Sequence, residues 1–124
     1  MKRLIPAGIL LILIILAYFS SQSYIMDTCN DARELVEICE KDYRDGKDAY
    51  QAAEKIEHLW EDNEKPLSFF VNHDRIDDIE LELSSLLLYS RSDEEELFYE
   101  HIERLKMLLH QLKEDTEINA HSVF

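Results

Sequence analysis

The chain opens with an apolar run and continues as a body in which apolar and polar residues alternate with helical spacing. Residues 4–19 contain no charged side chain, and Lys2 and Arg3 precede them. At 1.5 Å per residue this run makes roughly 24 Å of helix, and continuing it to Met26 gives about 34 Å. Because a hydrocarbon core is about 30 Å thick, the pattern predicts a transmembrane helix over residues 4–26.

The predicted membrane-facing positions are the large apolar side chains of this helix. Pro6 is compatible with it, because a proline in the first turn removes an N–H that would have no partner there. The anchor residues are Leu4, Ile5, Ile9, Leu10, Leu11, Ile12, Leu13, Ile14, Ile15, Leu16 and Phe19. We expect them to contact membrane lipid.

The distribution of basic residues predicts the orientation. Residues 1–3 form a basic head, and the next basic residue is Arg33, so the positive-inside rule places the head in the cytoplasm and the body outside a single-pass signal anchor. The alternative is a signal peptide cleaved near Ser23, where Ser21-Gln22-Ser23 is a poor small-x-small site. Both interpretations place the body outside, either tethered or secreted.

Helical periodicity predicts four helices behind the anchor. The inward positions of the first are Ala32, Leu35, Val36, Cys39 and Tyr43, and those of the second are Ala49, Ala52, Ala53, Ile56, Leu59 and Trp60. The third has Ile76, Ile79, Leu83, Leu86, Leu87 and Ser90, and the fourth has Phe98, Ile102, Leu105, Leu108, Leu109 and Leu112. Steps of three and four residues are typical of amphipathic helices, so we reject strands at residues 67–71 and 79–83, which also lack hairpin turn residues.

Local signals predict where these helices begin and end. Gly46 closes the first, and Asp48 caps the second, which reaches at least Lys65 before Pro66 breaks or kinks it. Asn72 or Asp74 starts the third, which runs to about Ser90, and a capping box from Ser92 to Glu95 opens the fourth.

The predicted fold is therefore all-α. An N-terminal transmembrane helix precedes a small antiparallel bundle of about four helices over residues 27–114. Residues 115–124 form a polar tail in which Ile118, Val123 and Phe124 are candidate docking points.

Two cysteines occur in the first body helix. Cys29 and Cys39 are ten positions apart, which on one helix separates their α-carbons by about 15 Å, whereas a disulfide spans at most about 7 Å. We expect two free, buried thiols, with an intermolecular bridge through Cys29 as the alternative.

The charge balance narrows the range of partners. Behind Phe19 the chain carries 11 basic and 27 acidic residues, a formal charge of −16. We do not expect nucleic acid or anionic lipid head groups as partners, because phosphate binding needs the opposite sign. We expect a protein partner of basic character or bound cations, and self-association into a homo-oligomer stays open.

The sequence contains no recognisable catalytic motif. Searches for Glu-x-x-His, His-Glu-x-x-His and Cys-x-x-Cys pairs, calcium loops, Gly-x-Ser-x-Gly elbows and phosphate-binding glycine loops find none. We predict no enzyme activity, no catalytic residue, no resident metal and no cofactor.

Two acidic clusters contain histidine. Glu54, Glu57, His58 and Glu61 are interpreted as a solvated helix face rather than a cation site. His73, Asp74, Asp77 and Asp78 begin the third helix, where its dipole favours negative charge without any ligand, and cation binding is the alternative.

The densest aromatic segment contains Trp60, Phe69 and Phe70. We expect these side chains to fill the core where the second and third helices meet. Any of them that is exposed would instead form a partner-binding patch with His73, Asp74, Asp77 and Asp78.

The chain resembles domain-of-unknown-function family four-three-six-three, short membrane-anchored helical proteins found chiefly in spore-forming Firmicutes. The similarity lies in the basic start with its apolar run, in Ser23-Tyr24-Ile25, in Ile56-Glu57-His58-Leu59-Trp60, in the segment from His73 to Ile79, in Ile102 with the segment from Leu105 to His110, and in Val123-Phe124. The resemblance implies an anchored extracytoplasmic helical domain linked to sporulation or the envelope. We expect a non-enzymatic interaction or scaffolding protein of the cell or spore envelope, with a divalent-cation-responsive sensor as the alternative.

Overall fold

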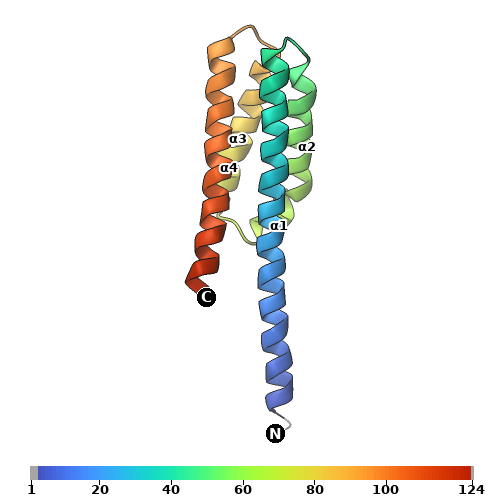
Figure 1. The fold of residues 1–124 in the computed structure, drawn as a ribbon, viewed down its shortest axis with the longest axis vertical. Coiled ribbons are helices and arrows are strands. Elements are labelled where there is room, and N and C mark those ends of the chain that lie inside the picture. The colour runs from blue at the N-terminus through green and yellow to red at the C-terminus, as the bar shows by residue number, and fades with distance from the viewer. Residues whose placement is uncertain (1–2, 124) are drawn as a thin grey trace.

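Four helices make up the protein in the computed structural model, which describes the backbone of residues 3–123 and the side chains of residues 3–117. They are α1 (Leu4–Arg44), α2 (Ala49–Ser68), α3 (His73–Tyr89) and α4 (Glu95–Val123). Figure 1 shows them packed side by side, with the N-terminal part of α1 extending beyond the others. The predicted all-α class and the four-helix bundle are confirmed.

The first helix is continuous over 41 residues and joins the predicted anchor to the predicted first bundle helix. The boundary expected after Met26 is not a break. Among the serines before it, Ser21 pairs its hydroxyl inside the helix, where Oγ donates to the Tyr18 carbonyl at 2.7 Å. We call residues 4–23 the stem. From Ile25 onward one face of α1 is buried, with Cys29, Ala32, Val36 and Cys39 following at helical spacing.

The chain runs back and forth along the bundle. Contacts join α1 to α2 and to α4, and α3 likewise packs against α2 and α4. The turn between α2 and α3 and the C-terminal part of α4 therefore lie at the end of the bundle from which the stem emerges, which we call the stem end (Figure 1). The core is built from the inward positions expected for each helix, and its largest fully buried side chains include Ile56, Leu86, Phe98 and Leu105.

The predicted helix ends are largely observed. Gly46 follows α1 with a φ of +73°, the left-handed conformation that suits glycine. Asp48 accepts a hydrogen bond from the Tyr50 N–H at 3.1 Å, and Asn72 accepts one from the Asp74 N–H at 3.1 Å. Each side chain satisfies a backbone donor that the helix leaves open.

Three ends differ from expectation. Pro66 lies inside the last turn of α2, which continues to Ser68, so it does not end the helix. Ser92 Oγ accepts a hydrogen bond from the Glu94 N–H at 3.2 Å. In the expected capping box the donor would be the next residue, Glu95. The segment expected to be a polar tail continues α4 to Val123, and the side chains of Ile118, Val123 and Phe124 lie outside the described residues.

Replacing Gly46 tests the turn between α1 and α2. A Cβ at this position would meet nothing within 4 Å, so the cost of Gly46→Ala is conformational. We expect the free energy of unfolding to fall by about 1 kcal/mol, and by less for Gly46→Asn, because asparagine tolerates the left-handed region better. Chemical unfolding in detergent, followed by circular dichroism, measures both. Gly8→Ala, within α1, is the matched control and should cause no loss.

Candidate functional site

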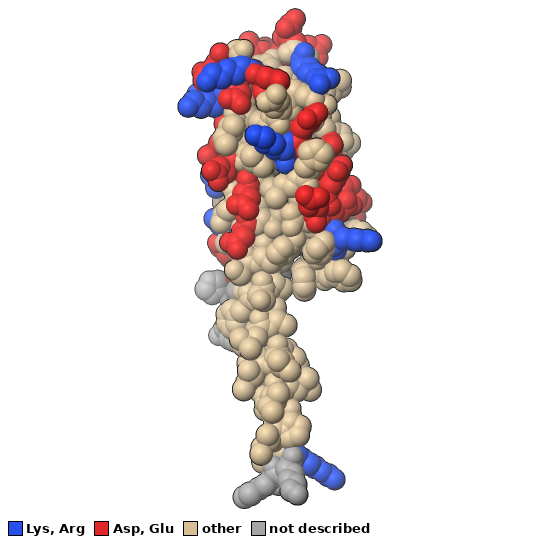
Figure 2. Space-filling view, turned by 90° about the vertical axis from the view of Figure 1, so that its right-hand side faces the viewer, with Lys and Arg blue, Asp and Glu red and all other residues tan. Residues whose placement is uncertain are grey.

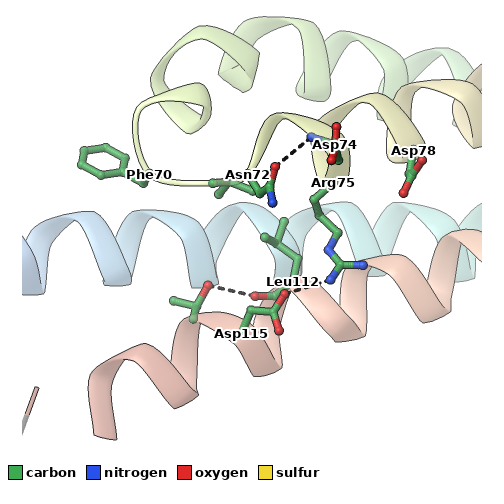
Figure 3. Close-up of a pocket in the computed structure, with 9 residues that line it drawn as sticks. Phe70, Asn72, Asp74, Arg75, Asp78, Leu112 and Asp115 are labelled. Atoms are coloured by element: carbon green, nitrogen blue, oxygen red, sulfur yellow. Dashed lines mark hydrogen bonds and ion pairs between the residues drawn. The ribbon is translucent and has the colours of Figure 1, made fainter. Parts of the chain in front are cut away.

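A pocket of about 420 Å³ opens at the stem end of the bundle. The α2–α3 turn forms one wall with Phe70 and Asn72, the first turns of α3 contribute Arg75, and α4 closes the far side with Leu112 and Thr116. Figure 3 shows Arg75 reaching from α3 toward Asp115 on α4, while Phe70 points away from them. Its lining includes Phe70, Asp74 and Asp78, three of the residues predicted to bind a partner.

Arg75 ties the two walls of the pocket together. One guanidinium nitrogen donates to Gln111 Oε1 at 2.6 Å and the other to Asp115 Oδ2 at 3.0 Å, so the start of α3 is fixed to α4 (Figure 3). The ion pair with Asp115 is partly exposed, which limits its strength. Because both nitrogens are engaged within the protein, Arg75 is occupied as a clamp and does not present a free charge to a ligand.

The acidic residues predicted at this helix start are exposed. Asp74, Asp77 and Asp78 lie on the first turns of α3, and the Asp74 backbone N–H is capped by Asn72. Their position beside the positive end of the helix dipole accounts for them without a ligand. Within residues 3–117, no group of three or more histidine, cysteine, aspartate and glutamate side chains is placed to hold a metal ion.

Of the three aromatic residues expected in the core, one is buried and two are exposed. Trp60 is buried at 3% exposure, as predicted, although its indole N–H has no hydrogen-bond partner. Phe69 and Phe70 are 81% and 55% exposed, so the core prediction is wrong for both. The reason is that Leu67 takes the inward position where α2 ends, and the turn after Ser68 directs Phe69 and Phe70 outward.

The acidic face on α2 is solvated in part: His58 and Glu61 are exposed, whereas Glu54 and Glu57 are half-buried. His58 lies 4.0 Å from Glu61, and both side chains are mostly exposed. The structure adds Glu64 and Glu80, which line a groove between α2 and α3 together with Glu57, Glu61 and Trp60. Spacing along one helix does not reveal this pair, because its two members come from different helices.

Glu64 and Glu80 share a hydrogen bond. This bond, together with burial and the negative charges of Glu64 and Asp77, raises the pKa of Glu80 to about 7, and the nearby His73 opposes the shift. The Glu80 carboxyl is therefore half protonated near neutral pH, when it can donate to its partner.

A second pairing between helices was not expected from the sequence. His101 Nδ1 lies 2.6 Å from Glu82 Oε2, and the His101 ring stacks on Tyr89 with centroids 5.2 Å apart. Both side chains are largely buried. Because Glu82 and Tyr89 lie on α3 and His101 lies on α4, this cluster connects the two helices.

The thiols are buried and free, as predicted for Cys29 and Cys39. Burial raises the pKa of Cys29 to about 11 and that of Cys39 to about 12, the latter with help from neighbouring Asp42 and Glu40. Cys39 Sγ also donates to the Ala49 carbonyl at 3.4 Å. Since the thiolate is the reactive form, neither thiol is suited to catalysis or to bridging another chain.

One family of proteins matches this chain. A family model described as a domain of unknown function (DUF4363) matches residues 19–123, so the chain belongs to that family and the resemblance noted in its residues is confirmed. Neither the curated proteins nor the solved structures provide a significant match.

Substitution of Arg75 tests the clamp at the pocket. Arg75→Ala removes two hydrogen bonds, and we expect it to lower the free energy of unfolding by about 1 kcal/mol. Arg75→Lys should recover only part of this, because an ammonium does not reproduce the fork geometry. The control is Arg33→Ala, which breaks the exposed pair with Glu37 and should cost less than about 0.5 kcal/mol. Equal losses for Arg75→Ala and Arg33→Ala would contradict the clamp.

The shared proton predicts a pH dependence of stability. The pKa of Glu80 rises from an ordinary 4.5 to about 7 on folding, so its contribution is complete below pH 4.5 and is lost as pH increases toward 7. Glu80→Gln should therefore melt above the wild type at pH 8, by less than about 4 °C, and match it near pH 4. Melting followed by circular dichroism at several pH values checks this. Glu34→Gln, exposed on α1, should show no such divergence.

Proposed function

We propose that this member of the DUF4363 family is a single-pass membrane protein whose bundle acts outside the cytoplasmic membrane as a non-enzymatic interaction or scaffolding protein of the cell or spore envelope. The observation that carries the proposal is α1, one helix with an exposed apolar half and a half built into the core.

The exposed half of α1 has the properties of a membrane span. It is long and apolar enough to cross a bilayer, and its most apolar window is not buried by the rest of the protein. Its large aliphatic side chains are between 36% and 74% exposed, from Ile15 to Leu4. Exposure of this surface to water would cost about 25 cal/mol of free energy for each apolar Å². In lipid this cost is absent, because the acyl chains are themselves apolar.

Continuity of α1 supports a retained anchor over a cleaved signal peptide. The segment around Ser23 is helical, and Gln22 Nε2 donates to the Thr116 carbonyl at 2.9 Å. A peptidase binds its substrate in an extended form, so cleavage here would require this segment to unwind from α4. The secreted alternative predicts a mature chain that begins near Tyr24.

The charge of the bundle suggests the character of its partner. Figure 2 shows acidic side chains spread over one face of the bundle, while the stem below is uncharged. With a formal charge of −16 behind Phe19, the bundle would attract a basic protein segment and repel anionic polymers.

A cation-responsive sensor is the second candidate, favoured by one observation. Glu57, Glu61, Glu64 and Glu80 line a single groove between α2 and α3. Calorimetric titration of the full-length protein with calcium, zinc and manganese distinguishes the two roles. Binding tighter than about 1 mM would favour the sensor, and its absence would exclude it.

Topology is tested by labelling in intact cells. We expect the full-length protein to resist extraction by alkaline carbonate, and a cysteine introduced as Asp93→Cys to react with a membrane-impermeant maleimide before lysis. The native thiols are the control, because both are buried and should stay unlabelled. Recovery from the medium with a new N-terminus near Tyr24 would show secretion, and labelling only after lysis would contradict the orientation.

The interaction role is tested by crosslinking in cells followed by mass spectrometry. We expect neighbours with basic segments, recovered at lower yield when Glu57, Glu61 and Glu64 are changed to glutamine. The matched control changes Glu34, Glu37 and Glu117 instead, which lie on other helices. The proposed role would be contradicted if no neighbouring protein is crosslinked above background.

A further inference from the structure

We infer that the turn between α2 and α3 is a second membrane contact, in which Phe69 and Phe70 insert into the outer interface of the bilayer beside the stem. This inference rests on the proposed anchoring of α1 and adds a residue-level contact that anchoring alone does not require. The bundle would then meet the membrane at two points.

The turn holds its two aromatic side chains outward in a defined geometry. Phe70 N–H donates to the Leu67 carbonyl at 3.0 Å, and Val71 N–H donates to the same oxygen at 2.9 Å. Leu67 is fully buried and Val71 packs against the core, so the turn is fixed from both sides. Phe69 is the most exposed of the large apolar side chains in the described part of the chain, at 81%.

The position of the turn along α1 matches the expected level of the outer interface. A hydrocarbon core of about 30 Å corresponds to about 20 helical residues, which counted from Leu4 ends near Ser23. Phe70 lines a small cavity with Tyr18, Ser21 and Ile25, so its ring lies at that level. Figure 3 shows the ring directed along α1 and away from α3.

The chemistry of the turn fits a lipid surface better than a protein groove. The inserted pair is apolar and continues the exposed apolar surface of the stem, which includes Phe19 beside the same end of the bundle. Aromatic side chains at the boundary between head groups and acyl chains are a common feature of peripheral membrane contacts. Because Asp74 and Asp78 follow closely on α3, the contact would be driven by apolar burial and not by attraction to anionic head groups.

A second contact restrains the orientation of the bundle. A single helix crossing the bilayer leaves the bundle free to tilt and to rotate about the helix axis. Insertion of the turn would fix one side of the bundle toward the membrane, with the pocket between α3 and α4 opening beside the lipid surface. The acidic groove between α2 and α3 extends farther along the bundle, where it stays accessible to a partner.

The test uses tryptophan fluorescence in the full-length protein. Phe69→Trp is reconstituted into phosphatidylcholine vesicles whose acyl chains carry bromine, which quenches nearby indoles, and into unbrominated vesicles. Wild type supplies the background from Trp60, the chain's single, buried tryptophan. The matched control is Leu88→Trp, which is also well exposed at 66% but lies at the opposite end of α3. Flotation of the same vesicles reports anchoring independently.

We expect every variant to float with the vesicles, and the fluorescence added by Phe69→Trp to be largely lost in brominated lipid while that of Leu88→Trp is retained. Flotation without quenching at position 69 would overturn the second contact and leave the anchor intact, with the exposed pair then available to a protein. Equal quenching at positions 69 and 88 would also overturn it. Failure to float would overturn the anchoring itself, and the second contact with it.

Discussion

The rest of the structure depends on the continuity of the hydrogen bonds along α1. An α-helix satisfies its own backbone groups, so one segment can pass from an apolar stem into a folded core without exposing an unpaired N–H or C=O. The stem and the bundle therefore share one rigid element of 41 residues. Where α1 ends at Arg44, Gly46 reverses the chain, and the other three helices return alongside its second half.

Polar contacts join α1 to α2 and α4 near the stem, and to the loop before α4 at the far end of the bundle. Near the stem, Tyr24 donates to Asn63 on α2, and Gln22 donates to the backbone of Thr116 on α4. At the far end, the Tyr43 hydroxyl donates to the Ser92 carbonyl at 3.0 Å, and its ring stacks on Phe98. Partly buried polar contacts of this kind fix the register of helices that apolar packing alone would leave free to slide. The stem and the bundle are thus joined by α1 and by contacts near its middle.

Periodicity was sufficient to predict the helices and their buried faces, because each inward stripe is a local property of one segment. Positions such as Val36, Ile56 and Phe98 are buried as their spacing indicates. The join between the predicted anchor and the first bundle helix was not predicted, because the sequence has no local signal that tells one long helix from two consecutive ones after Met26. The sequence wrongly predicted Phe69 and Phe70 in the core, because hydrophobic side chains are usually buried. The direction of the turn decides instead which residues face the core. The Glu64 and Glu80 pair depends on how α2 lies against α3, which no single segment encodes.

Hydrogen exchange tests the central claim, that one uninterrupted helix belongs to both the membrane and the bundle. The full-length protein in lipid nanodiscs should show slow amide exchange through residues 18–30, without a fast segment at the serines, because every amide there donates within a helix that is fixed by lipid on one side and by the core on the other. A fast-exchanging gap between residues 20 and 23, flanked by protected segments, would show two separate helices and contradict the account.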